Sequence, residues 1–160
     1  AGVYGMAGLV LELAEEYPDC KVEIVAGVTA ALSGGALLGA PLMHDFAVIS
    51  LSDLLTPWEK IERRLRLAAG ADFVICLYNP SSRKRADYLA RACRILREEL
   101  EESRVCGLAG RIGRPGETVR VVTLGELEQL PMDMFTTVFI GNSQTKVLDG
   151  RMVTPRGYRL

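Results

Sequence analysis

The sequence has 160 residues, of which 49% are hydrophobic and 24% charged, and its formal net charge is −1. This balance is typical of a globular protein, and the length is enough for one domain or for one domain and part of another. The sequence has neither a signal segment nor an apolar run of about 20 residues, so we expect a cytoplasmic protein without a membrane partner. A charge near zero gives no field that attracts nucleic acid, and we exclude that partner too.

Four cysteines and a single histidine restrict the redox and metal chemistry. Cys20, Cys76, Cys93 and Cys106 form no Cys-x-x-Cys pair, and three of them lie in apolar surroundings. This pattern favours reduced core thiols over disulfides or metal ligands. Since His44 is the only histidine, a histidine-based metal site is not available, and we predict no metal.

Taken in chain order, the apolar residues alternate between helical and strand spacing. Glycine, proline and capping patterns mark the ends of the segments. The first expected elements are a helix over 2–16, a strand over 22–25 and a helix from Thr29 to near Gly39. They are followed by a buried strand over 46–51, a helix after a capping box at 56–59, a strand over 72–77 and a long amphipathic helix after Pro80. The last expected elements are strands over 105–108 and 118–124, one helical turn over 125–129, a strand over 136–140 and a hairpin around Asp149 and Gly150. The alternation predicts an α/β fold with a mostly parallel sheet.

The break in the pattern at Pro41 predicts a domain boundary, which divides the chain into residues 1–42 and 43–160. The strand over 22–25 has no other strand near it in sequence, and the first two helices carry wide apolar faces. The sequence also begins at Ala1 rather than at a methionine. We therefore expect that the strands of an N-terminal domain are missing and that residues 1–42 are its last part.

Three segments are candidates for ligand binding. The strand, glycine turn and small-residue helix over 22–31 resemble the way α/β folds present a helix N-terminus to a ligand, although an ordinary turn has the same pattern. Residues 77–80 (Leu-Tyr-Asn-Pro) end a predicted strand, where open sheets bind ligands, but they also fit a plain loop. The basic run 83–85 opposes the dipole of the helix that follows; an anionic ligand would explain it, as would a solvated face.

A cleft is expected near residues 41–53, because ligand sites often form at domain boundaries. His44 and Asp45 lie beside the predicted boundary, although a lone histidine is more often structural than catalytic. No nucleophile and base at a suitable spacing support a catalytic triad. The loop over 110–117 matches neither a phosphate-binding Walker loop nor Gly-x-Gly-x-x-Gly.

These segments also carry a resemblance to a known family. Residues 2–7 resemble the stretch after the central Gly-Asp loop of the tetrapyrrole (corrin/porphyrin) methylases, and residues 23–31 resemble their Val-Pro-Gly-x-Thr-Ala segment. The resemblance covers essentially the whole chain. The segments that resemble the branch acting on carbon 17 are residues 39–46, 49–53, 56–58, 77–80, 113–116 and 140–145.

The resemblance implies the tetrapyrrole methylase fold, with an α/β C-terminal domain built on a mixed sheet and, before it, the last elements of an N-terminal α/β domain. It implies an enzyme of cobalamin biosynthesis, usually a homodimer, that methylates carbon 17 of precorrin-3B or cobalt-precorrin-3 and contracts the macrocycle. The methyl donor would be S-adenosyl-L-methionine, which becomes S-adenosyl-L-homocysteine in the cleft between the domains. The residues implied to bind this cofactor are Gly2, Val3, Thr29, Ala30, Leu77, Tyr78, Ile112, Thr136 and Thr137.

The substrate implied by the resemblance carries many carboxylates, for which arginine is a suitable partner. The residues implied to bind it are Ser50, Ser52, Asn79, Arg83 and Arg111, with Lys84, Arg85 and Arg114 nearby. Ring contraction needs a proton transfer from a hydroxyl group. The candidates for the general base are His44, Asp45 and Asp53.

The sequence departs from the family pattern at three places. Ala26 replaces the usual proline, Arg111 and Ile112 replace a smaller and more polar pair, and the N-terminal glycine loop is absent. We therefore expect the 160-residue chain to be inactive alone. The alternatives are methylation at carbon 11 or 20, a uroporphyrinogen methyltransferase, a non-catalytic dimerising fragment, and a nucleic-acid methylase, which the net charge disfavours.

Overall fold

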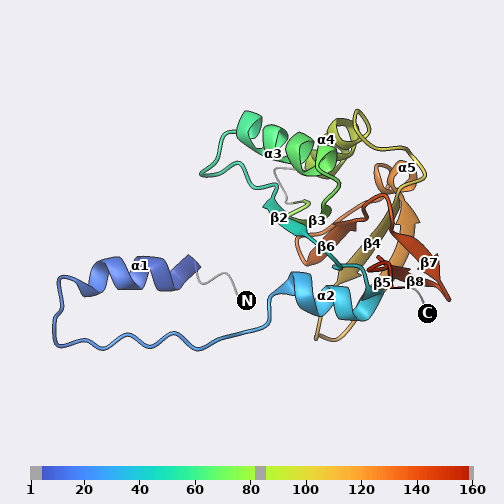
Figure 1. The fold of residues 1–160 in the computed structure, drawn as a ribbon. Helices are drawn as coiled ribbons and strands as arrows, with labels where there is room; N and C mark the ends of the chain where they lie inside the picture. Colours follow the sequence, from blue (N-terminus) through green and yellow to red (C-terminus); the bar gives the residue numbers. More distant parts are fainter. Residues whose placement is uncertain (1–4, 82–85, 159–160) are drawn as a thin grey trace.

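A five-stranded sheet forms the centre of the structure, a computed structural model that describes residues 5–81 and 86–158. Helices α3 (Trp58–Gly70) and α4 (Tyr88–Leu96) lie on one face of the sheet, and helix α2 (Ala30–Leu38) lies on the other (Figure 1). This arrangement of helix, sheet and helix confirms the predicted α/β class.

The sheet is mixed rather than mostly parallel. Its strands are β2 (Phe46–Ser50), β3 (Val74–Tyr78), β6 (Thr136–Ile140), β4 (Val105–Gly110) and β5 (Thr118–Thr123), in this spatial order. Only β2 and β3 are parallel; the three other pairings are antiparallel. The mostly parallel sheet expected from the alternation is therefore wrong, and the mixed sheet is confirmed. A parallel return needs a crossover of about a dozen residues or more, and the loop between β4 and β5 is shorter and holds no helix.

Alternate residues of the strands face two separate apolar cores. Ile75 and Leu77 of β3 face α3 and α4, whereas Cys76 faces α2 together with Phe139 of β6. All four side chains are fully buried. Because successive side chains of a strand point to opposite faces, burial on both sides explains the continuous apolar sequence of β3. Strand β2 lies at the sheet edge, and only Ile49 within it is buried, so the prediction of a buried strand there is wrong.

A second, smaller sheet joins distant parts of the chain. Strand β1 (Gly39–Ala40) runs parallel to β8 (Arg151–Val153), which forms a hairpin with β7 (Lys146–Leu148). Asp149 and Gly150 have φ values of 49° and 71°, as a tight two-residue hairpin turn requires, so the predicted hairpin is confirmed. The pairing of β1 with β8 was not part of the sequence prediction.

The chain before α2 lies apart from both cores (Figure 1). Helix α1 (Gly5–Ala14) confirms a predicted helix, but it contains no buried residue. The strand predicted over 22–25 is wrong, since these residues form no strand and are mostly exposed. A strand needs a neighbour with which to pair, and the sheets of the described chain place none beside this segment.

The capping box also differs from the prediction. Helix α3 begins at Trp58 with Pro57 at its N-cap, and no side chain caps it, so the box expected over 56–59 is wrong. Pro57 has ψ 142° and is therefore still extended, so the helix begins one residue later than the capping box at 56–59 predicted. A capping box is instead present at Thr123 and Glu126, at the start of the short helix α5 (Leu124–Leu127). The long helix expected after Pro80 is the nine-residue helix α4.

The four thiols differ sharply in exposure. Cys76, Cys93 and Cys106 are buried, whereas Cys20 is exposed. Burial raises the pKa of Cys76 and of Cys93 to about 12 and also raises the pKa of Cys106, because it disfavours the thiolate. We expect Ellman's reagent to modify one thiol rapidly in the native protein and all four in guanidinium chloride. Cys20→Ser should abolish the rapid phase; a second rapid thiol would contradict the burial of the other three.

Candidate functional site

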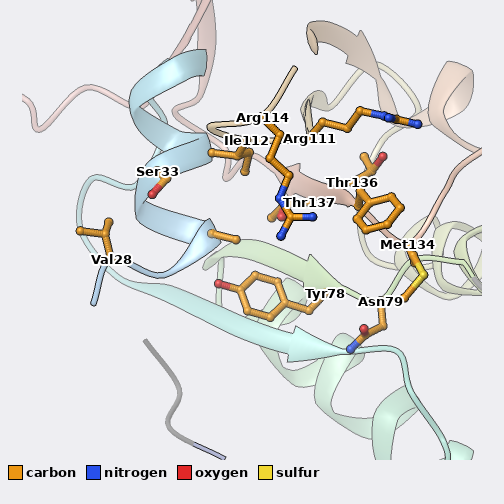
Figure 2. A pocket seen from close by; sticks show the side chains of 12 residues that line it. Val28, Ser33, Tyr78, Asn79, Arg111, Ile112, Arg114, Met134, Thr136 and Thr137 are labelled. Carbon is orange, nitrogen blue, oxygen red and sulfur yellow. The ribbon is translucent and has the colours of Figure 1, made fainter. Parts of the chain in front are cut away.

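A cavity of about 380 Å³ opens at the end of the sheet where strands β3 and β4 finish and β6 begins (Figure 2). Ser50 at the end of β2 pairs with Tyr78 at the end of β3, and Gly110 at the end of β4 pairs with Thr136 at the start of β6. Helix α2 supplies the remaining wall. The residues that line the cavity are Val28, Ala30, Ser33, Tyr78, Asn79, Arg111, Ile112, Arg114, Met134, Phe135, Thr136 and Thr137. The cavity therefore lies beyond the carboxyl ends of strands, where open α/β sheets bind ligands.

The backbone turns sharply at two positions on the rim of the cavity. Asn79 follows β3 directly with φ 55°, and Arg111 follows β4 directly with φ 52°. Left-handed backbone is tolerated by asparagine but is uncommon for arginine, and such residues gather at functional sites. The Asn79 side chain donates from Nδ2 to Oγ of Ser50 at 2.9 Å, which joins the ends of β2 and β3.

Tyr78 connects the sheet to the beginning of α2. Its hydroxyl group accepts a hydrogen bond from the Ala31 amide at 2.8 Å and shares another with the Thr29 hydroxyl at 2.5 Å. Thr29 occupies the N-cap position of α2, but its side chain makes no capping bond. The phenol of Tyr78 thus fixes the position of Ala30, which lines the cavity.

The rim of the cavity is positively charged. The guanidinium carbons of Arg111 and Arg114 lie 5.8 Å and 5.7 Å from the centre of the Phe135 ring. In the described part of the chain, neither arginine forms an ion pair with a carboxylate. Two guanidinium groups beside one aromatic ring form a surface suited to an anionic, planar ligand. In Figure 2 the Arg114 side chain extends toward Tyr78, whereas the Arg111 side chain extends away from it.

Most of the cofactor residues implied by the sequence meet at this cavity. Leu77 is an exception, since its side chain is fully buried in the core against α3 and α4 and it is not among the residues that line the cavity. Gly2 and Val3 lie outside the described residues. Those that line the cavity are Ala30, Tyr78, Ile112, Thr136 and Thr137, and Thr29 is bonded to Tyr78.

The substrate residues form a partly connected group. Asn79 and Arg111 line the cavity. Ser50 is bonded to Asn79, and the Ser52 amide donates to Oγ of Ser50 at 3.2 Å. Arg83, like Lys84 and Arg85, lies outside the described residues.

The three general-base candidates do not form one constellation. His44 and Asp45 precede β2, at the end of the strand opposite to Asp53, which follows it. His44, with φ 63°, donates from Nε2 to the Pro155 carbonyl oxygen at 3.3 Å, away from the cavity lining. Asp53 accepts a 2.5 Å hydrogen bond from the Tyr88 hydroxyl. The catalytic roles of these residues stay predictions.

Sequence reasoning missed four residues of the lining, Val28, Ser33, Met134 and Phe135. Met134 and Phe135 directly precede β6 and are 62% and 46% exposed, although both are large and apolar. Two large apolar residues just before the start of a predicted strand were the available sign that this segment contributes to a binding site. Val28 lies within the segment 22–31, which the sequence marks as a candidate for ligand binding without singling out this residue, whereas the contact of Ser33 with the cavity depends on how α2 packs.

Residues 5–81 and 86–158 contain neither a candidate membrane span nor a candidate metal-binding cluster. Their helices are too short or too polar to cross a bilayer. The same residues place no three metal-binding side chains of histidine, cysteine, aspartate or glutamate together.

The fold is an α/β domain with helices on both faces of the sheet and a cavity at the strand ends, and comparison with known proteins identifies its family. The sequence profile described as "Tetrapyrrole (Corrin/Porphyrin) Methylases" matches residues 1–128. The chain belongs to this family, whose members are methyltransferases with S-adenosylmethionine as the methyl donor.

Similar proteins carry more specific names. A "Probable cobalt-factor III C(17)-methyltransferase" of Salmonella typhimurium is 51% identical over 161 residues, covering 100% of this chain and 67% of that protein. A "Precorrin-3B C(17)-methyltransferase" of Sinorhizobium sp is 45% identical, covering 98% of this chain and 65% of that protein. The chain thus spans about two thirds of the length of these relatives.

Solved structures confirm the tetrapyrrole methylase fold. The crystal structure of the methyltransferase CobJ has a TM-score of 0.87 and 39% identity, covering 96% of this chain and 66% of the other. A uroporphyrin-III C-methyltransferase from Thermus thermophilus, complexed with S-adenosyl homocysteine, has a TM-score of 0.64 at 21% identity. The second likeness supports the fold alone.

Proposed function

We propose that this chain carries a methyl-transfer site that acts on carbon 17 of a corrin precursor in cobalamin biosynthesis. The observation that supports this most is the convergence of Ala30, Tyr78, Ile112 and Thr137 on one cavity in a chain whose full-length relatives bear C(17)-methyltransferase names. The substrate is precorrin-3B or a cobalt-containing form of it, cobalt-precorrin-3. The same proposal includes a cytoplasmic location.

The cavity fits the adenosyl part of the methyl donor. Its volume of about 380 Å³ lies in the range of small-molecule sites, which are mostly apolar with a few placed polar groups. Val28 and Ile112 supply apolar surface, and the hydroxyl groups of Ser33, Thr136 and Thr137 supply hydrogen-bonding groups. We propose that these residues, with the backbone at Leu77, hold S-adenosylmethionine.

The chemistry of the site is mainly positioning. When bound, S-adenosylmethionine supplies an electrophilic methyl group. The chain's own residues must orient the two reactants and exclude water. We propose that α2 and the end of β3 hold the donor, and that Arg111 and Arg114 orient substrate carboxylates at the rim. Ser50, Ser52 and Asn79, which are linked by hydrogen bonds, extend this substrate side.

Asp53 is the general-base candidate with the best placement for this proposal. It follows the carboxyl end of β2, at the same end of the sheet as Ser50 and Asn79, and it accepts a hydrogen bond from Tyr88. A base must lie within reach of the proton that it removes. His44 and Asp45, at the other end of β2, fit that requirement less well.

Binding of S-adenosylhomocysteine tests the cofactor part of the proposal. Isothermal titration calorimetry with the 160-residue chain should show one site. Ala30→Leu, which places a larger side chain in the cavity wall, should weaken binding at least about tenfold through steric overlap. Ala36→Leu, the same substitution at an exposed position of α2, should not. No binding by the unsubstituted chain, or equal loss in both variants, would contradict the proposal.

Product analysis tests the position of methylation. Because the 160-residue chain is expected to be inactive alone, the test uses a protein extended to the length of the relatives, together with the methyl donor and precorrin-3B or its cobalt complex. The product should gain one methyl group, and position-labelled NMR should place it on carbon 17. A methyl group at carbon 11 or 20 would favour the alternative, another tetrapyrrole methyltransferase. Binding of the substrate without any transfer by this longer protein would favour a non-catalytic role.

Domain division and assembly are further parts of the proposal. We propose that residues 1–42 and 43–160 belong to two domains, with α2 and β1 contacting the second one. We also propose a homodimer. It is supported by large apolar side chains of α1 that are exposed in the single chain, among them Met6 and Leu13, which are 73% and 51% exposed. Sedimentation of the purified chain tests this.

A further inference from the structure

The Tyr78 hydroxyl group is the point at which strand β3 holds the beginning of helix α2. It lies 2.8 Å from the Ala31 amide nitrogen and 2.5 Å from the Thr29 hydroxyl oxygen. The residues that it joins are 47 and 49 positions away in sequence. The contact therefore exists only because the sheet and the helix pack together.

This contact replaces an ordinary helix cap. The first amide groups of a helix have no partner within the helix, and a threonine at the N-cap usually accepts from the second or third of them. Thr29 has the extended backbone of an N-cap residue, with φ −72° and ψ 154°, but its side chain caps nothing. Its hydroxyl is turned to Tyr78, and the phenol oxygen accepts from the amide that Thr29 leaves open.

The same contact sets the distance between two walls of the cavity. Val28, Ala30 and Ser33 line one wall, and Tyr78 and Asn79 line the other (Figure 2). Among the described residues, the two bonds of the Tyr78 hydroxyl are the side-chain hydrogen bonds between residues 28–33 and β3. The chain before α2 is largely exposed, so it offers little other packing to hold the first turn in place.

We propose that Tyr78 is a positioning residue, whose hydroxyl caps α2 from the sheet and thereby holds the cavity at the width that the methyl donor needs. The inference rests on the proposed function for the identity of the ligand. It assigns Tyr78 an effect on affinity through Thr29 and Ala31, in place of the direct cofactor contact that the family resemblance implied. Tyr78 and Thr29 act as one unit through the hydrogen bond between their hydroxyl groups, so removing either hydroxyl should have a similar effect.

Tyr78→Phe tests the inference, because it removes the hydroxyl and keeps the ring. We expect the Ala31 amide to exchange with deuterium about tenfold faster, since it loses its acceptor. We expect the Kd for S-adenosylhomocysteine to rise about tenfold. Thr29→Val should weaken binding similarly, and the double variant should be no weaker than Tyr78→Phe alone. Thr29→Ser, which keeps the hydroxyl, should bind as the unsubstituted chain does.

Thr154→Val is the control for a general loss of stability. Its buried hydroxyl bonds to the Pro41 carbonyl and to Thr145, away from the cavity lining. It should lower the thermal midpoint without changing the Kd. The inference is overturned if Tyr78→Phe leaves the Ala31 exchange rate and the Kd unchanged, or if Thr154→Val weakens binding equally. If the unsubstituted chain fails to bind the ligand, the proposed function fails, and faster exchange at Ala31 still decides whether Tyr78 caps α2.

Discussion

Gly34→Val is expected to lower the free energy of unfolding by about 3 kcal/mol, the upper part of the range for overpacked cores. Gly34 lies where α2 meets the sheet, and a Cβ atom there would be 3.0 Å from both Ala109 Cβ and Phe139 Cζ, and 3.1 Å from Ile112 Cδ1. Valine adds two further methyl groups to this contact, so the helix must move outward. Urea unfolding measures the loss. Because Ala30 and Ser33 move with the helix, affinity for S-adenosylhomocysteine should fall as well.

Two controls separate packing from helix propensity. Gly8→Val places the same substitution in α1, where nothing lies within 4 Å of the added Cβ, and it should change stability little. Phe139→Leu should partly rescue Gly34→Val, because it removes one of the two closest atoms, which would appear as non-additive free energies. A Gly34→Val chain as stable as the unsubstituted one would show that α2 does not pack as described.

Asp72→Asn is expected to lower the free energy of unfolding by about 2 kcal/mol near pH 7, less than for a fully buried ion pair because Asp72 is half exposed. The Arg104 side chain is only 8% exposed, and its Nη1 lies 3.6 Å from Asp72 Oδ1. Its Nη2 donates to Glu101 at 2.9 Å, but Nη1 and Nε find no hydrogen-bond partner in the described chain. Asp72 also accepts from the Ser143 amide and hydroxyl at 2.7 and 2.6 Å. Asparagine tolerates the φ of 57° at this position, so the lost charge is the main change.

The effect should disappear in acid. Burial alone raises the pKa of Asp72, but the bonds from Ser143 and the charge of Arg104 outweigh it and hold the pKa below its ordinary value of 3.8. The stability from this carboxylate is therefore present above pH 3.8 and is lost as the pH falls through the lowered pKa. The free energies of unfolding of Asp72→Asn and of the unsubstituted chain should converge at a pH below the lowered pKa of Asp72. Glu102→Gln, at an exposed ion pair with Arg97, should change stability by less than about 1 kcal/mol at any pH.

The elements that the sequence predicts well are those set by local burial. Strand β3 is buried on both faces, so its apolar run marks it with little ambiguity, and β6 follows the same rule. Strand β2 has a similar apolar sequence but lies at the sheet edge, where one neighbour is absent. Spacing reports what a segment prefers, and it carries no information about which strands become neighbours.

The candidate site divides in the same way. Tyr78 is the last residue of β3, and Asn79 and Arg111 directly follow β3 and β4, so all three lie at strand ends, which are visible in sequence. The role of Tyr78 toward Thr29 and Ala31 depends on a contact across 47 residues or more, which no local pattern contains. His44 shows the opposite case: its neighbours in sequence suggest a cleft, yet its ring reaches Pro155, 111 positions away.

The pairing of β1 with β8 has a consequence for synthesis. Strand β1 directly follows α2, and the Thr154 hydroxyl after β8 donates to the Pro41 carbonyl across 113 residues. Contacts of such long range form late, because the intervening chain must first be ordered. On the ribosome, α2 therefore emerges long before the strand that anchors its end. The end of α2 that leads into β1 therefore gains this anchor only after β8 has left the exit tunnel, and a nascent chain that stalls earlier lacks the smaller sheet.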